Sequence, residues 1–175
     1  AVVSTSTNSV VILRLRGRSD LGTTFMDVVF RYAEALAAVD SKLMIIDGES
    51  LNVVGHVALG MTGHVTLTPD RSELLVSTAY MTKLNRGERI GQMDVYDANT
   101  LKLKAEISVP PKHAQSMPYR GSIRTSADGR LVFMQNSTPA SSVTVVDRIA
   151  GKFVAEIATP GCWLIYVPQS VSDRF

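Results

Sequence analysis

A pattern that recurs every 50 residues organises most of this 175-residue chain. Three short β-rich segments each end in an aspartate, at Asp47, Asp97 and Asp147, and each is followed by a turn and a second β-rich segment. An aspartate that leads a turn accepts hydrogen bonds from backbone N–H groups two residues further on and so closes a hairpin. A fixed period of this length is typical of solenoids and β-propellers. The repeat therefore predicts a mainly β fold, and identical turn positions favour hairpin formation over an acidic site for these three aspartates.

A second hairpin is expected within each period. Residues 63–77 place Pro69 and Asp70 between two alternating apolar runs, and residues 121–134 repeat the arrangement around Asp128 and Gly129. Two hairpins per period give four strands, the content of one propeller blade. We therefore predict a partial β-propeller of about two to three four-stranded blades over residues 43–175, with a solenoid of β-arches as the less favoured alternative. Repeat folds need about three or more units for stability, so the chain is expected to be a fragment of a larger ring and to self-associate.

The segment before the repeat, residues 1–42, has a different pattern and is predicted to be a separate unit. Residues 10–16 alternate as a strand, and residues 23–39 carry an apolar stripe at helical spacing, formed by Met26, Val29, Phe30, Ala33, Leu36 and Ala37. With a strand expected at residues 43–46, the order strand, helix, strand predicts a βαβ crossover. The strand, the turn at residues 16–24 and the stripe after it resemble the start of a STAS domain of sulfate-permease-type transporters. That resemblance implies an alternative function, a regulatory or protein-interaction module with an appended β-repeat region.

Composition and motifs exclude several classes of function. The formal net charge is +2, without a basic block that would follow a phosphate backbone, so nucleic acid is not expected as a partner. Neither a membrane-spanning apolar run nor a secretory signal is present, although a chain that begins at Ala1 can be a processed one. The three histidines, His56, His64 and His113, lack the spacing of a zinc site, and Cys162 is the only cysteine, so no metal site is predicted.

Residues 43–175 resemble the heavy subunit of the quinoprotein amine dehydrogenases, nearest to the aromatic amine type. The resemblance is spread collinearly over the segment and is carried by Gly63-His64-Val65, Leu84-Asn85-Arg86-Gly87-Glu88-Arg89, Val95-Tyr96-Asp97, residues 106–112, residues 135–140 and Gly161-Cys162-Trp163.

The resemblance implies a structural role in a periplasmic enzyme. Proteins of this family are seven-bladed propellers that pair with a small light subunit, which carries the tryptophan tryptophylquinone cofactor and passes electrons to a copper protein. The chain is therefore expected to be scaffold and channel wall. It is predicted to be non-catalytic on its own, because the quinone requires two tryptophans and Trp163 is the only one in the chain.

Individual residues acquire expected roles from the same resemblance. Met61 stands where the family places a phenylalanine that shapes the substrate channel, and methionine fills a similar volume without a rigid ring face. Cys162 matches a cysteine that is bridged to a downstream partner in the family, and this chain contains no such partner. Arg86 and Arg89 form a charged loop tip, for which a solvated loop and a weak partner-binding site are both open.

Overall fold

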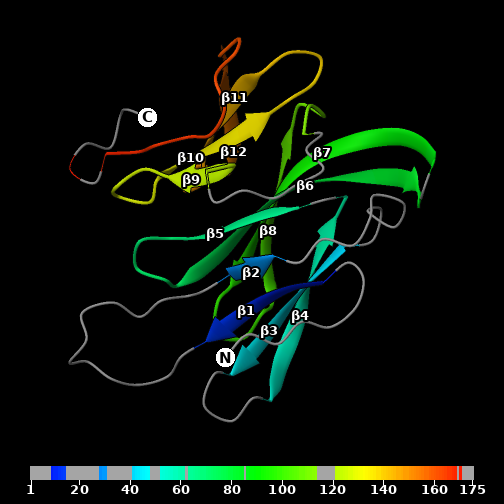
Figure 1. The fold of residues 1–175 in the computed structure, drawn as a ribbon, viewed down its shortest axis with the longest axis vertical. Helices are drawn as coiled ribbons and strands as arrows, with labels where there is room; N and C mark the ends of the chain where they lie inside the picture. Colours follow the sequence, from blue (N-terminus) through cyan, green and yellow to red (C-terminus); the bar gives the residue numbers. More distant parts are fainter. Residues whose placement is uncertain are drawn as a thin grey trace.

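The computed structural model describes residues 9–14, 28–30, 41–47, 52–61, 63–84, 86–113, 121–168 and 170. They form three four-stranded sheets (Figure 1). The first sheet has the order β2-β1-β3-β4, with β1 (Ser9–Arg14), β2 (Val28–Phe30), β3 (Ser41–Asp47) and β4 (Val53–Gly60). The second contains β5 (His64–Leu67), β6 (Glu73–Lys83), β7 (Arg86–Asp97) and β8 (Leu103–Val109). The third contains β9 (Ile123–Thr125), β10 (Leu131–Asn136), β11 (Ser142–Asp147) and β12 (Lys152–Ala158). The prediction of a mainly β fold is confirmed.

The second and third sheets are meanders in which consecutive strands pair antiparallel. Asp97 ends β7 and Asp147 ends β11, so the two aspartates occupy equivalent turns. The Asp97 carboxylate accepts hydrogen bonds from the backbone N–H groups of Asn99 and Thr100 at 3.0 and 2.7 Å, and that of Asp147 accepts one from Ala150 at 2.8 Å. The predicted role of both aspartates as hairpin formers is confirmed.

The turns at Asp70 and Asp128 also repeat each other. Ser126 donates its hydroxyl to Asp128 at 2.5 Å, and Thr68 does the same to Asp70 at 2.5 Å. Each carboxylate also accepts a backbone N–H two residues further on, at 3.1 Å for Asp70 and 3.0 Å for Asp128. These bonds favour the ionised carboxylate and lower the pKa of Asp70 to about 2. The hairpins predicted around both aspartates are therefore present, as β5–β6 and β9–β10.

The prediction of a helix over residues 23–39 is wrong at Val28–Phe30, which form strand β2 and pair antiparallel with β1. A run of two valines and a phenylalanine has high strand propensity, and so short an apolar run fits a helical period and a strand equally well. The rest of the predicted helix lies outside the described residues. The parallel pairing of β1 with β3, which a crossover requires, is observed. β1 and β2 lie in the same sheet as β3 and β4. The division of the chain into two units at residue 42 stays a prediction.

The three sheets stack face to face, and apolar side chains fill the spaces between them. The first interior layer joins β3 and β4 to the second sheet and contains Leu43, Ile45, Val57, Leu59, Leu74, Val76 and Tyr96. The second joins the second and third sheets and contains Leu75, Met93, Val95, Ile107, Ile123, Val132, Met134 and Val146. Neighbouring residues of β6 enter opposite layers, as expected for a strand that is buried on both faces.

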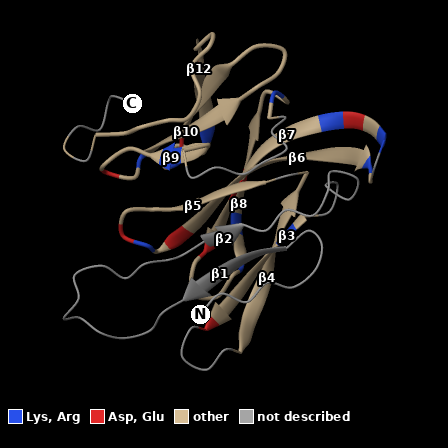
Figure 2. Cartoon of the chain, in the orientation of Figure 1, with Lys and Arg blue, Asp and Glu red and all other residues tan. Residues whose placement is uncertain are grey.

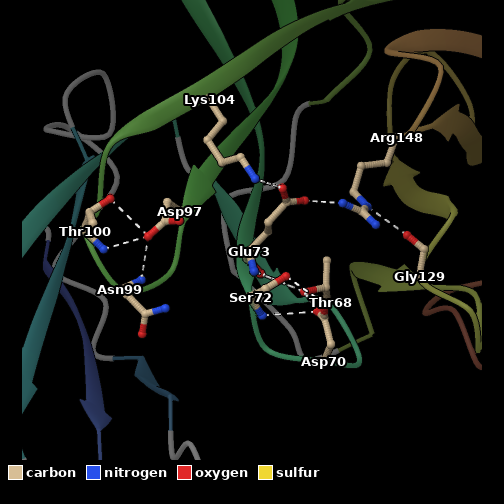
Figure 3. A network of polar contacts seen from close by, with 10 residues as sticks. All are labelled: Thr68, Asp70, Ser72, Glu73, Asp97, Asn99, Thr100, Lys104, Gly129 and Arg148. Atoms are coloured by element: carbon tan, nitrogen blue, oxygen red, sulfur yellow. Dashed lines mark hydrogen bonds and ion pairs between the residues drawn. The ribbon is translucent and has the colours of Figure 1, made fainter.

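A polar network joins the second and third sheets near the turns that contain Asp70, Asp97 and Gly129 (Figure 3). The Glu73 carboxylate accepts hydrogen bonds from Lys104 of the same sheet and from Arg148, which follows β11. Arg148 also donates through Nε to the Gly129 carbonyl at 2.8 Å. Glu73 is buried, and both of its carboxylate oxygens have cationic partners, so its burial is compensated.

The far face of the third sheet is covered by the chain that follows β12. Ile165 is buried against Phe133, Val143 and Val145, and its backbone N–H donates to the Gly121 carbonyl at 2.8 Å. The apolar face that an incomplete stack would expose is thus partly occupied by the chain itself. Among the described residues, no helix is long and apolar enough to span a membrane.

Candidate functional site

Strand direction places the predicted site residues at one end of the sheets. The connections from one sheet to the next begin at this end, which we call the connector end. The strands that finish there are β4, β6, β8, β10 and β12. Met61 follows β4, Arg86 and Arg89 lie beside the β6–β7 turn, and Cys162 follows β12. The aspartate turns lie at the opposite end, the turn end. No hydrogen bond or ion pair within the described part of the chain joins the four predicted side chains to one another.

Backbone and side-chain contacts hold the segment that carries Met61 in one position. The Met61 N–H donates to the Ala79 carbonyl at 2.8 Å, and the Thr78 hydroxyl donates to the Leu59 carbonyl. Gly60 has φ 53°, and a Cβ there would lie 2.6 Å from Thr78 Oγ1 and from the Ala79 carbonyl oxygen. Only glycine fits this approach, and the bonds on either side anchor Met61 to β6. The partly exposed Met61 side chain therefore starts from a fixed backbone.

The structure also brings together two histidines that sequence spacing did not connect. His64 begins β5 and His113 follows β8, and their buried rings meet edge to face with centroids 4.5 Å apart. Burial lowers the pKa of His64 well below 6.5, and the nearby His113 lowers it further. Ser77 Oγ lies 3.4 Å from His113 Nδ1. The residues that the structure describes contain no group of three metal-ligating side chains, and His56 is exposed on β4.

A third cluster, which sequence reasoning missed, lies at the base of the β6–β7 hairpin. Asp94 is buried and accepts hydrogen bonds from the Tyr80 hydroxyl at 2.7 Å and from Gln92 Nε2 at 2.6 Å. Gln92 Nε2 also donates to Glu106 Oε1 at 2.8 Å. Burial raises the pKa of Asp94, as expected for a carboxyl removed from water. An acidic residue set among Met93, Val95 and Tyr96, the apolar part of β7, was the signal available in the sequence.

The two arginines predicted at the loop tip lie on a hairpin whose charged end Figure 2 shows as alternating basic and acidic bands on β7. Arg86 is exposed and Arg89 is partly buried. Burial lowers the pKa of Arg89, whose Nε atom is buried and has no hydrogen-bond partner among the described residues. The fourth predicted residue, Cys162, is exposed and carries a free thiol.

The described region is thus a stack of β sheets with its candidate functional groups gathered at one end. The chain belongs to the methylamine dehydrogenase heavy chain (MADH) family, which it matches over residues 28–174. This match begins within residues 1–42, for which a STAS-like module was the alternative interpretation, so that alternative function is not favoured.

Curated relatives agree with the family match. The chain is 26% identical over 128 residues to the methylamine dehydrogenase heavy chain of Methylobacillus flagellatus, covering 73% of this chain and 32% of the relative. It is 29% identical over 150 residues to that of Methylorubrum extorquens, covering 84% and 36%. Methylophilus methylotrophus has another such relative, 24% identical over 126 residues, with 72% and 31% covered. The chain spans about a third of the length of the curated relatives it matches.

Two solved structures are similar over part of the chain. The periplasmic gluconolactonase PpgL of Pseudomonas aeruginosa has a TM-score of 0.43 and 21% identity, with 63% of this chain and 31% of that chain covered. Hydrazine synthase of Kuenenia stuttgartiensis has a TM-score of 0.34 and 15% identity, with 71% and 44% covered.

Proposed function

We propose that this chain is part of the heavy subunit of an amine dehydrogenase, where it is a scaffold that binds the quinone-bearing light subunit and lines the amine channel. The observation that carries the proposal is the family match over residues 28–174, which includes both antiparallel sheets and the connector end. The activity and partners of the complete assembly come to this chain by that relationship. The aromatic amine type and the periplasmic location, with a copper protein as the electron acceptor, are parts of the same proposal and rest on the motif resemblance.

We further propose that the stacked sheets are propeller blades. The second and third sheets have the blade order of four antiparallel strands, and they pack face to face through a continuous apolar layer. The first sheet supplies β3 and β4 as the outer pair of a preceding blade, since Asp47 N–H donates to the Asn52 carbonyl at 2.9 Å as Asp97 N–H does to Lys102 at 2.9 Å. This arrangement supports a predicted content of about two to three blades.

Met61 is proposed as the residue of this chain that borders the amine channel. Its fixed backbone supports the proposal, because a channel wall that discriminates between substrates has to hold its position when the substrate binds. The methionine side chain is unbranched and adapts its shape, so it can accept substrates that a rigid aromatic ring at the same place would reject.

The chemistry of amine oxidation is assigned to the light subunit. Tryptophan tryptophylquinone is built from two tryptophans, and Trp163, which is exposed, is the only tryptophan of this chain. The residues of this chain therefore do not fit the cofactor, and no catalytic step is assigned to them. When bound in its own subunit, the quinone supplies the electron acceptor for the amine, while this chain orients and confines the substrate.

Co-expression of the chain with the light subunit, followed by dye-linked oxidation of phenethylamine and methylamine, tests the proposal. We expect the complex to turn over an amine and the chain alone to do nothing. Met61→Ala is expected to change the ratio of kcat/KM between the two amines by about tenfold, the effect of a methylene or two in an apolar pocket. Leu103→Ala, at the turn end, is the control and should leave the ratio unchanged. Absence of a complex would refute the scaffold role, and an unchanged ratio in Met61→Ala would refute the channel assignment.

A further inference from the structure

The β6–β7 hairpin is longer than the sheet that supports it. β6 and β7 have 11 and 12 residues, whereas the corresponding strands β10 and β11 have 6 each. β5 pairs only with residues 74–77 of β6, and β8 pairs only with residues 91–96 of β7. Residues 80–84 and 86–90, which we call the arm, therefore pair only with each other and project from the connector end (Figure 1).

The tip of the arm has a defined conformation. Glu88 N–H donates to Thr82 Oγ1 at 3.0 Å, and Leu84 takes the left-handed conformation with φ 58°. Gly87 has φ 95°, and a Cβ there would collide with the Thr82 hydroxyl. A projecting segment with a fixed shape loses little conformational entropy when it binds a partner, so the arm is suited to recognition.

The basic side chains of the arm lack anionic partners. Lys83, Arg86 and Arg89 make no ion pair within the described residues, whereas Lys104, Lys112, Arg130 and Arg148 are all paired with carboxylates. Met81 pairs with Arg89 and Lys83 pairs with Arg86 across the hairpin, with an irregularity of the ladder between the two pairs, so the three cations lie within one short stretch of the arm. Glu88 is the only acidic residue between positions 80 and 90, which leaves the arm with an excess of positive charge.

Arg89 is the most informative of these cations. Its Nε atom is buried without a hydrogen-bond partner among the described residues, although the side chain as a whole is only partly buried. The part of the side chain that stays exposed is available to a carboxylate of another molecule, with which arginine forms charge-assisted hydrogen bonds. Beside it, Leu84 and Ile90 are 72% and 42% exposed and offer an apolar contact.

We propose that the arm docks against an acidic face of the light subunit, with Arg86 and Arg89 each paired to a carboxylate and Leu84 in an apolar depression between them. This inference rests on the proposed function: Met61, the proposed channel residue, lies at the connector end, so the light subunit is expected to bind at that end. The basic excess of the arm selects an acidic partner, and its exposed leucine selects a protein surface over a purely ionic ligand. The arm lies at the same end as Met61, so docking there would also fix the position of the light subunit relative to the channel.

The test compares binding of the purified light subunit to three forms of the chain by titration calorimetry. The double variant Arg86→Glu/Arg89→Glu is expected to raise the Kd by about 10- to 100-fold and to weaken its dependence on salt. The charge-matched control Lys102→Glu/Lys152→Glu reverses two exposed lysines at the turn end and should bind within about twofold of the unaltered chain. Arg89→Lys, which keeps the charge and loses the fork, is expected to fall between the two.

Each other outcome overturns the inference in a distinguishable way. Equal affinity of the arm variant and the unaltered chain would show that the light subunit binds elsewhere and would leave the proposed function intact. Failure of the unaltered chain to bind would refute both proposals. Sedimentation of the same proteins tests whether a second copy of this chain binds the arm instead. If the arm variant loses self-association and keeps its affinity for the light subunit, the arm is an interface between copies of this chain. Unchanged thermal midpoints of the variants establish that they fold.

Discussion

Replacing Glu73 with glutamine should destabilise the contact between the second and third sheets more than any other single polar substitution in that region. The side chain of Glu73 is 10% exposed and that of Arg148 is 16% exposed, so the variant leaves a largely buried guanidinium without its anionic partner, although the Gly129 carbonyl still accepts from it. Removing one partner of a fully buried pair costs about 3–5 kcal/mol, and the residual exposure and the remaining bond reduce this to about 2–3 kcal/mol. In a chain of 175 residues this corresponds to a fall of about 5–10 °C in Tm.

A double-mutant cycle measured by urea unfolding separates the two pairs that Glu73 makes. Glu73→Gln combined with Arg148→Met should give a coupling energy of about 2 kcal/mol, because this pair is shielded and joins two sheets. Glu73→Gln combined with Lys104→Met should give less than about 1 kcal/mol, since the lysine side chain is 47% exposed. Additive effects for the Glu73 and Arg148 substitutions would refute the reasoning, because they would mean that the two sheets do not meet at this network in solution.

Three further predictions concern the core, the buried histidine and the end of the stack. Leu75→Ala should cost about 2–5 kcal/mol in urea unfolding, because Leu75 is fully buried between two sheets, whereas Leu103→Ala should change little; similar losses would contradict the layering. The lowered pKa of His64 means that the folded chain binds fewer protons than the unfolded one, so this contribution to stability is present above about pH 6.5 and is lost as the pH falls. His64→Gln should reduce the difference between urea midpoints at pH 7.5 and 5.5, and His56→Gln should not; an equal pH dependence in all three proteins would exclude this role. Three apolar residues of β12 are exposed, namely Phe153, Val154 and Ile157, and sedimentation over a concentration series should show self-association through them. A monomer at all concentrations that binds no hydrophobic dye would contradict this.

Features of the fold that depend on local chemistry were predictable from the sequence. The turns at Asp97 and Asp147 form because each carboxylate bonds backbone groups within three residues, so the motif carries its own conformation. Strand β2 was missed, because Val28–Phe30 is too short for its periodicity to separate helix from strand and its pairing with β1 is a tertiary contact.

In the candidate site too, features set by local sequence were predictable and those that depend on tertiary contacts were not. Met61, Arg86, Arg89 and Cys162 were named from motifs, and the strand directions put all four at one end. The contact of His64 with His113 joins the start of the second sheet to the connection that leaves it, and the link of Glu73 to Arg148 joins the second sheet to the third, so both depend on the tertiary structure and not on local sequence. Asp94 was missed for a similar reason, since its hydroxyl partner Tyr80 lies across the hairpin on a neighbouring strand.

β1 pairs in parallel with the edge of β3 that faces away from β4, and this pairing affects which segments can bind to that edge. In the other two sheets the corresponding edge is occupied by an antiparallel strand from the adjoining hairpin, β6 or β10. The hydrogen bonds between paired strands join backbone groups. The edge of β3 therefore discriminates between pairing segments by their length and extended shape far more than by their side chains. β1 occupies this edge because a segment of the same chain has a high effective concentration there. It also covers an edge that could otherwise pair with another chain and lead to aggregation. An extended peptide added in excess would therefore compete for this position through the same kind of backbone bonds, but against the high effective concentration of β1.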